Sequence, residues 1–217
     1  MESRVVHNLV GCSGGSCWFH PHEGAVAAVG IGAGGFGGAG AGGGTAADSV
    51  AGQGLRTKTE SGKSEARKGR TSQAWNRMGW RQLRTKAEHA AECAVHSYGQ
   101  VRDFFLHNAC KSLDRALLTV ADGSGNTIVV SIAWVRMGSA SAAEKLKDLA
   151  DTDGTGNVSP LGAAVLELGE IDFTGDYYSS DRRGALTVIS EAAPGSGHPD
   201  GDEMDAATEI AVLFPPP

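Results

Sequence analysis

The chain has 217 residues, which is enough for one domain with tails but excludes more than two small domains. Glycine is the outlier in composition: 11 of the 21 residues from Gly24 to Gly44 are Gly, and this density excludes a packed helix or strand there. The net charge of −6 conceals an asymmetry, because residues 55–92 carry a balance of +6 whereas residues 114–217 carry −11.

The first 72 residues are predicted to form a disordered, Gly-rich and basic N-terminal region. The uncharged run 24–47 is long enough to cross a bilayer as a helix, since roughly twenty residues suffice. Small residues spaced four apart, as at Gly30 and Gly34, are also found where membrane helices pack closely. The alternative, a flexible linker, is favoured by the low content of large apolar residues, which are Val26, Val29, Ile31 and Phe36.

A basic arm follows, from Arg56 to Lys86. Together with Trp75 and Trp80 as stacking surfaces, its charge suits a nucleic acid. The same residues would suit an anionic membrane surface. The alternative is that the arm is solvated or meets the acidic half of the chain, and four acids dilute its charge, namely Glu60, Glu65, Glu88 and Glu92.

Apolar residues then recur at intervals of three and four between residues 80 and 105, which predicts a long amphipathic helix, kinked or broken near Gly99. On such a helix His89, Cys93 and His96 would share one stripe, and their nitrogen and sulfur atoms are ligands that zinc accepts. The alternative is the half-exposed flank of a helix without a metal.

The next segment predicts a β-hairpin. Runs 115–121 and 127–137 are joined by the polar tip 122–126. In the second run, alternate large apolar residues share one face and smaller apolar residues share the other, which is typical of a central strand packed under a helix. The residues of the first set are Ile128, Val130, Ile132 and Trp134.

After this hairpin, the capping box from Ser141 to Glu144 predicts a helix that runs to about Ala150. Runs 171–178 and 185–191 predict a second hairpin around the tip 179–184. Acidic residues from Asp202 onward suit the start of a last helix. We therefore expect an α+β domain over residues 73–214. Its antiparallel sheet would be built from two hairpins in ββα-ββα order, with helices on one face and the long helix in front.

One loop resembles an EF-hand calcium site. It runs from Asp151 to Ser159, and its oxygen-bearing residues stand at the expected positions with Gly156 at the sixth. The predicted ligands are Asp151, Asp153, Thr155, Asn157 and Ser159. The twelfth position departs from the pattern, because Gly162 stands where the bidentate Glu is expected. The favoured alternative is therefore a turn that ends a helix.

Tyr177, Arg182 and Arg183 gather around the predicted second hairpin tip, where they could bind an anion or a partner. The four cysteines form two pairs along the chain, Cys12/Cys17 and Cys93/Cys110. Their number fits two disulfides in an oxidising compartment or four thiols in a reducing one.

Five short segments carry a resemblance: VRDFF (101–105), IAWVRM (132–137), GTGNV (154–158), FTG (173–175) and RRGALTVI (182–189). The likeness runs from about Val101 to Phe214, about half of the chain, and this part resembles a group of uncharacterised proteins from high-GC Gram-positive bacteria with a C-terminal α+β domain. Such proteins often carry a membrane segment ahead of an outward-facing domain, so the resemblance implies a Cys93–Cys110 disulfide. The positive-inside rule points the other way, because it places residues 56–86 in the cytoplasm.

We expect a non-enzymatic binding or interaction module with a protein partner, and a membrane-associated or extracytoplasmic location is favoured over a cytoplasmic one. One alternative is a divalent-metal protein that binds calcium through residues 151–159 or zinc through the histidine and cysteine stripe. The other is a cytoplasmic nucleic-acid-binding protein that uses residues 56–86. The sequence contains no nucleophile elbow, P-loop or metalloprotease motif, and it identifies no small-molecule substrate.

Overall fold

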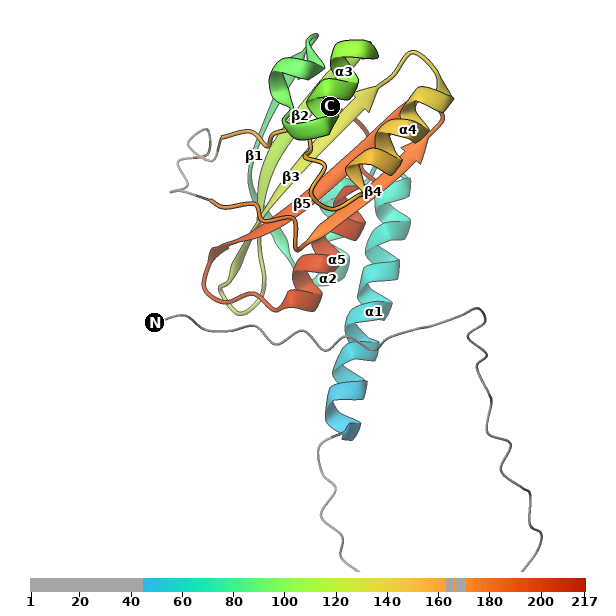
Figure 1. The fold of residues 1–217 in the computed structure, drawn as a ribbon. Helices are drawn as coiled ribbons and strands as arrows, with labels where there is room; N and C mark the ends of the chain where they lie inside the picture. The colour runs from blue at the N-terminus through green and yellow to red at the C-terminus, as the bar shows by residue number, and fades with distance from the viewer. Residues whose placement is uncertain (1–44, 163–165, 167–170) are drawn as a thin grey trace, which may run out of the picture. The chain divides into compact units, whose positions relative to one another are not determined.

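The computed structural model describes residues 45–162, 166 and 171–217. The helices are α1 (Thr45–Arg67), α2 (Thr71–Met78), α3 (Gly99–His107), α4 (Ala140–Ala150) and α5 (Gly201–Ala211), with the short 3₁₀-helix η1 (Cys93–His96) before α3. The strands are β1 (Arg81–Ala90), β2 (Ser112–Ala121), β3 (Thr127–Arg136), β4 (Tyr178–Arg183) and β5 (Leu186–Ser196). Figure 1 shows helices packed around a sheet, so the fold is α+β, as the sequence predicts.

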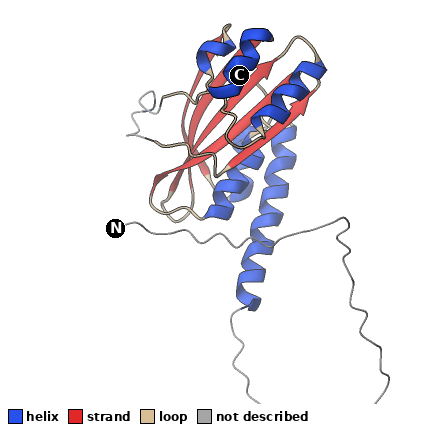
Figure 2. Cartoon of the chain, viewed as in Figure 1, coloured by secondary structure: helices blue, strands red, loops and turns tan. Residues whose placement is uncertain are grey.

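The strands of the described chain form one antiparallel sheet in the order β1-β2-β3-β5-β4 (Figure 2). β2 and β3 form the first predicted hairpin, with Leu118 opposite Val130. β4 and β5 form a second hairpin, which joins the first through β5, where Val188 lies opposite Trp134. β1 and β4 are therefore the edge strands. From β2 onward the chain runs strand, strand, helix, strand, strand, helix.

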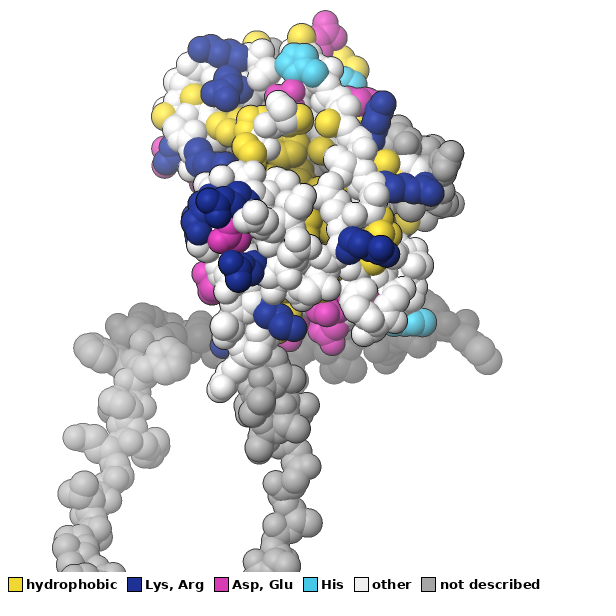
Figure 3. Space-filling view, turned by 180° about the vertical axis from the view of Figure 1, so that it is seen from behind, with side chains coloured by type: hydrophobic (Ala, Val, Ile, Leu, Met, Phe, Trp, Pro, Cys, Tyr) yellow, Lys and Arg dark blue, Asp and Glu magenta, His cyan; other side chains and the backbone are white. Residues whose placement is uncertain are grey.

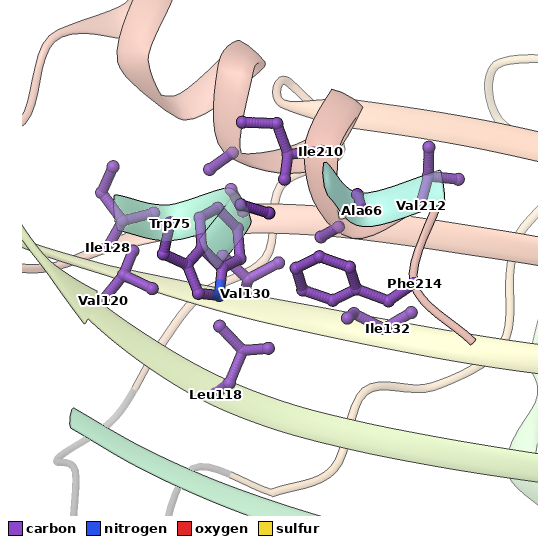
Figure 4. Packing of buried hydrophobic residues seen from close by; sticks show 14 of the residues in the cluster. Ala66, Trp75, Leu118, Val120, Ile128, Val130, Ile132, Ile210, Val212 and Phe214 are labelled. Atoms are coloured by element: carbon purple, nitrogen blue, oxygen red, sulfur yellow. The ribbon is translucent and has the colours of Figure 1, made fainter. Parts of the chain in front are cut away.

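One face of the sheet is covered by α1, α2 and α5 and holds the larger core (Figure 4). Ile128, Val130 and Ile132 of β3 point into this core, as their alternation predicts. Trp75 on α2 is fully buried, and its ring meets that of Phe214 edge-on at a centroid distance of 5.2 Å. The helices contribute further apolar side chains, namely Ala66, Ala74, Met78, Met204, Ala207 and Ile210.

The opposite face is covered by η1, α3, α4 and the segment that follows α4. Val101 and Phe105 of α3 pack there with Leu146 of α4 against β2 and β3. The prediction of helices on one face only was therefore wrong. The reason lies in β3, where Val129 and Val135 are buried as completely as the residues between them, which is the pattern of a strand covered on both faces.

The long amphipathic helix predicted over residues 80–105 does not form, because β1 occupies much of that stretch. Leu83, which the helical pattern places in the core, is 45% exposed. β1 instead pairs with β2 along its length, from Arg81 opposite Ala121 to Ala90 opposite Leu113. Pairing with the open edge of a sheet satisfies the backbone of this segment and outweighs the intrinsic helix preference of its Ala, Lys and Glu residues.

Helix α1 occupies part of the region predicted to be disordered. Its packing against α5 explains the difference: Ala66 is buried, and Lys63 pairs with Glu209 of α5 at 3.1 Å. Gly62 permits a close approach of the two helices, since a Cβ at this position would come within 2.7 Å of the Ile210 side chain. The stability of α1 comes from this packing and not from its own polar sequence, so the sequence alone gives little sign of it.

The predicted N-terminal region up to residue 44, and with it almost all of the proposed span 24–47, lies outside the described residues. Among the helices of residues 45–217 that the structure describes, none combines the length and the apolar character needed to cross a bilayer.

The two helices that follow the hairpins begin at caps that differ slightly from prediction. Ser139, and not Ser141, caps α4, because its hydroxyl accepts a hydrogen bond from the Ala142 N–H at 3.1 Å. The Asp200 carboxylate caps α5 by accepting from the Asp202 N–H at 2.8 Å. Both caps satisfy backbone donors that the first helical turn leaves free.

Candidate functional site

The zinc stripe predicted from His89, Cys93 and His96 is not present, because β1 replaces the helix that would align it. The ring of His89 on β1 bonds instead to the Asp114 carboxylate, with 2.6 Å between Nδ1 and Oδ1. The sulfur of Cys93 is bonded to Cys110 and is therefore not a thiolate ligand. Residues 45–217, as far as they are described, contain no group of three or more His, Cys, Asp or Glu residues that could hold a metal ion.

A disulfide joins Cys93 of η1 to Cys110, two residues before β2. The two positions are 17 residues apart and their Cα atoms are separated by 6.2 Å. The bond therefore encloses most of η1 and all of α3, and it ties this segment to the sheet. Disulfides persist mainly in oxidising compartments.

The carboxylate of Asp151, the first residue of the EF-hand-like loop, is occupied by protein donors. Lys147 and Ser180 bond to it at 2.5 and 2.6 Å, and the Tyr178 hydroxyl donates to it at 3.0 Å. Partial burial acts to raise the pKa of Asp151, but these hydrogen bonds outweigh burial and hold that pKa below its ordinary value. The ionised Asp151 carboxylate therefore links the end of α4 to Tyr178 and Ser180 of β4.

The other predicted calcium ligands also serve the loop itself. The Thr155 hydroxyl donates to a backbone carbonyl at the end of α4 at 2.6 Å, and the Asn157 side chain accepts from the next N–H at 2.8 Å. Asp153 is exposed, and Ser159 donates its N–H to the His96 carbonyl at 2.8 Å. Calcium binding by this loop stays a prediction.

The same loop braces the start of α3. Backbone hydrogen bonds join Tyr98 to Asn157 at 3.0 Å and Gln100 to Thr155 at 2.7 Å. The two segments meet at glycines with positive φ, at +62° in Gly99 and at +88° in Gly156. An added Cβ would come within 2.5 Å of a backbone oxygen at either position, so only glycine fits this crossing.

Tyr177, Arg182 and Arg183 do not form the predicted anion site, because residues 178–183 are the strand β4 and not a hairpin tip. Arg183 donates instead to three carbonyls at the end of α5, those of Val212, Leu213 and Phe214. Arg182 bonds to the Gly184 carbonyl at 3.3 Å. Tyr177, at the other end of β4, packs against the larger core.

The basic arm is divided among α1, α2 and β1, and Figure 3 shows Lys and Arg spread over this side of the molecule with acids among them. Three cations, Lys68, Arg70 and Arg77, converge on Glu65, a buried side chain. Trp75 and Trp80, which the sequence offers as stacking surfaces, are both buried in the core. That part of the nucleic-acid interpretation was wrong.

Helices α3 and α4 lie over the same face of the sheet (Figure 1). On that face, a cavity of about 470 Å³ opens between the start of α3, the loop after α4 and β4. Its walls come from the start of α3, the loop after α4, and residues 173–175 before β4. Tyr98, Phe173 and Tyr178 supply aromatic rings, and Glu191 of β5 lies among them. We call this the Glu191 cavity.

Glu191 is the unusual residue of this cavity, because it is 7% exposed and has no salt-bridge partner among the described residues. One carboxylate oxygen, Oε1, accepts from the Gly175 N–H at 2.6 Å. The other oxygen, Oε2, has no hydrogen-bond partner among the described residues and is open to solvent in the cavity. Burial raises the pKa of Glu191, and the nearby Asp176 carboxylate adds to this effect, against the hydrogen bond from Gly175.

Two tyrosines flank this carboxyl group. Tyr98 is 52% exposed, and partial burial together with the negative charge of Glu191 raises the pKa of its phenol. Tyr178, which lies opposite Glu191 on β4, also has a raised pKa, caused by burial and by the Asp151 carboxylate. Both hydroxyls are therefore protonated and neutral across the physiological range, so the cavity presents neutral rings together with the carboxyl groups of Glu191, Asp151 and Asp153.

Sequence reasoning missed the three residues that define this cavity, Glu191, Tyr98 and Tyr178. One signal was present: Glu191 is the single charged residue in the stretch 186–193, which the structure buries on both faces. The tyrosines gave no such signal, because the cavity arises only when α3 and β4 come together.

Comparisons of this chain with protein-family models, with curated proteins and with solved structures find no match.

Proposed function

We propose that this protein is a non-enzymatic binding module whose ligand enters the Glu191 cavity. The observation that carries the proposal is a buried carboxyl group with one unpaired oxygen in a cavity lined by aromatic rings. The second oxygen of this largely buried carboxyl group is open to the cavity, so it offers an acceptor with which a ligand group can pair. Cavities with apolar walls and a few placed polar groups are the usual form of small ligand sites.

Binding is supported over catalysis by the state of the neighbouring polar groups. Asp151 is held by three donors, and Thr155 and Asn157 are bonded to backbone groups. A catalytic nucleophile needs a general base within hydrogen-bond reach. One such pair lies at the cavity, the Tyr178 hydroxyl and the Asp151 carboxylate at 3.0 Å, but Lys147 and Ser180 share that carboxylate. Among the described residues, Glu191 bonds to the Gly175 N–H alone.

The partner we propose is a protein, and its contact surface is the segment η1–α3 beside the cavity. Four large apolar side chains of the described chain are exposed, and three of them lie on this segment: Val95 (69%), Tyr98 (52%) and Leu106 (63%). Exposed apolar side chains gathered in one place are typical of interaction sites. The disulfide across the same segment supports an extracytoplasmic location for this module.

The proposal can be tested by mapping where small probes bind the full chain. We expect a panel of neutral, anionic and cationic fragments to shift the amide resonances of Tyr98, Gly175 and Glu191 in ¹⁵N–¹H spectra. Tyr98→Ala should weaken the best fragment by about tenfold, because a contact ring is lost. Leu83→Ala is the matched control, since Leu83 is an exposed apolar residue of β1 that lies outside both the partner surface and the cavity. Amide shifts at other residues, or no amide shifts with any fragment, would contradict the proposal.

A further inference from the structure

We propose that the ligand group bound in the Glu191 cavity is an alkylammonium ion, seated between the Glu191 carboxylate and the tyrosine rings. This inference rests on the proposed function, because it names the chemistry of the ligand for the same cavity.

The first argument is charge. Glu191 lies beside the Asp176 carboxylate, which opposes its ionisation, and the carboxylates of Asp151 and Asp153 also line the cavity. Lys147 pairs with Asp151 at 2.5 Å but is not one of the residues that line the cavity. An anionic ligand would add to the unbalanced negative charge, whereas a cation would neutralise it.

The second argument is the aromatic lining. Tyr98, Phe173 and Tyr178 all border the cavity, and their ring faces carry the negative part of the aromatic quadrupole. A cation that sits over such a face within about 6 Å of the ring centre is attracted to it, and the attraction grows when water is excluded. Tyr98 is half-exposed at the edge of the cavity, so its ring is free to cover a ligand that enters.

The third argument separates an ammonium from a guanidinium ion. A guanidinium group binds a carboxylate best through two parallel hydrogen bonds, one to each oxygen. Oε1 of Glu191 already accepts from the Gly175 N–H at 2.6 Å, so a bidentate guanidinium would have to share that oxygen with the backbone. An ammonium ion is a compact charge that needs a single acceptor, so the cavity suits it better.

The test is a titration of the ¹⁵N-labelled full chain with n-butylammonium chloride at constant ionic strength. The comparison probes are 1-butanol, which has the same carbon chain without charge, and n-butylguanidinium. We expect butylammonium to bind at the Tyr98, Gly175 and Glu191 amides at least about tenfold more tightly than butanol, because it adds a charge-assisted hydrogen bond. Butylguanidinium should be the weaker of the two cations.

Glu191→Gln should reduce butylammonium binding about tenfold and leave butanol binding unchanged, since the amide retains the acceptor for Gly175 but loses the charge. The matched control is Glu144→Gln, the same exchange at an exposed residue of α4 that does not line the cavity. Circular dichroism and the dispersion of the amide spectrum establish that both variants are folded. A second variant, Tyr98→Phe, retains the ring and should retain binding.

The source of the ammonium group is resolved by a further probe, Nα-acetyl-lysine methylamide. If it binds more tightly than butylammonium, the ligand is a lysine side chain of the protein partner; if it binds more weakly, the ligand is a free amine. Both results support the inference. Equal binding of butylammonium and butanol would overturn it while leaving the cavity as a binding site. The absence of cavity shifts with every probe would overturn the proposed function as well.

Discussion

Burial of Glu191 without a cation has a consequence for stability that depends on pH. Its pKa in the folded protein lies above its value in the unfolded chain, so the folded state holds the proton more tightly. The stability associated with this group is therefore complete below the ordinary pKa of glutamate and is lost as pH rises through the raised value. The Asp176 carboxylate acts in the same sense as burial, whereas the hydrogen bond from the Gly175 N–H opposes both. The phenols of Tyr98 and Tyr178 are neutral, and Asp151 also lines the cavity.

We therefore predict that Glu191→Gln stabilises the protein at pH 8 and that the gain disappears near pH 4. Each 1 kcal/mol recovered should raise Tm by about 2–4 °C in a protein of this size. Thermal unfolding followed by circular dichroism at both pH values measures the difference. Glu144→Gln, at an exposed position, should show no such dependence. A gain that is equal at both pH values would mean that the Glu191 charge is compensated in the folded state.

The glycine crossing between α3 and the loop after α4 predicts a second residue-level effect. Gly156→Ala places a Cβ within 2.4 Å of the Tyr98 carbonyl oxygen at a φ of +88°. We expect a loss of about 1–3 kcal/mol in the free energy of unfolding, measured by urea denaturation. Gly123→Ala is the control, because no atom lies within 4 Å of its Cβ position, and it should change stability little. Similar free energies of unfolding for the two variants would show that the close approach of Gly156 to Tyr98 does not limit stability.

At the scale of elements, β4 and α5 are joined by Arg183, whose guanidinium donates to the carbonyls of the three residues that follow α5 and also pairs with Asp181 at 3.2 Å. Arg183→Ala should reduce the free energy of unfolding by about 1.5 kcal/mol. Arg182→Ala removes a neighbouring arginine with a single carbonyl contact at 3.3 Å, and it should cost less than about 0.5 kcal/mol. Guanidinium denaturation of the two variants provides the measurement, and equal losses would show that the helix end does not depend on Arg183.

The hairpin β2–β3 could be predicted from sequence because its signal is local. Its alternation places Ile128, Val130 and Ile132 on one face, and a polar tip separates the strands. β1 could not be recognised in this way, because most of its side chains are exposed and show no alternation of apolar and polar residues. It is a strand only through its pairing with β2. The same limit applies to α1, which is stabilised by its contact with α5.

The candidate site shows this limit more strongly. Tyr98, Tyr178 and Glu191 are separated by as much as 93 positions along the chain, and only the assembled sheet and the α3 crossing bring them together. The patterns that were visible in the sequence lead to other roles. Arg183 supports a helix end, Asp151 anchors β4, and Cys93 forms a disulfide. Residue types that are common at functional sites are also those that proteins use to join distant elements.

At the scale of the whole molecule, the Cys93–Cys110 disulfide connects the proposed partner surface to the sheet. The segment that it encloses carries Tyr98 and Leu106, and only a few of its residues enter the core, among them Val101 and Phe105. Because the bond closes a loop of 17 residues, its removal should lower the free energy of unfolding by about 3 kcal/mol through the entropy of the unfolded chain.

We predict this loss for the double variant Cys93→Ser/Cys110→Ser, measured by urea denaturation without reductant. Dithiothreitol should bring the original protein close to the variant and should leave the variant itself unchanged. We also expect the variant to bind cavity probes more weakly, since Tyr98 is then less firmly held beside Glu191. Peptide mass mapping after alkylation identifies which cysteines are bonded in the protein isolated from its host. Equal stability of variant and original protein would mean that the loop contacts of Gly99 and Gly156 alone hold α3 in place.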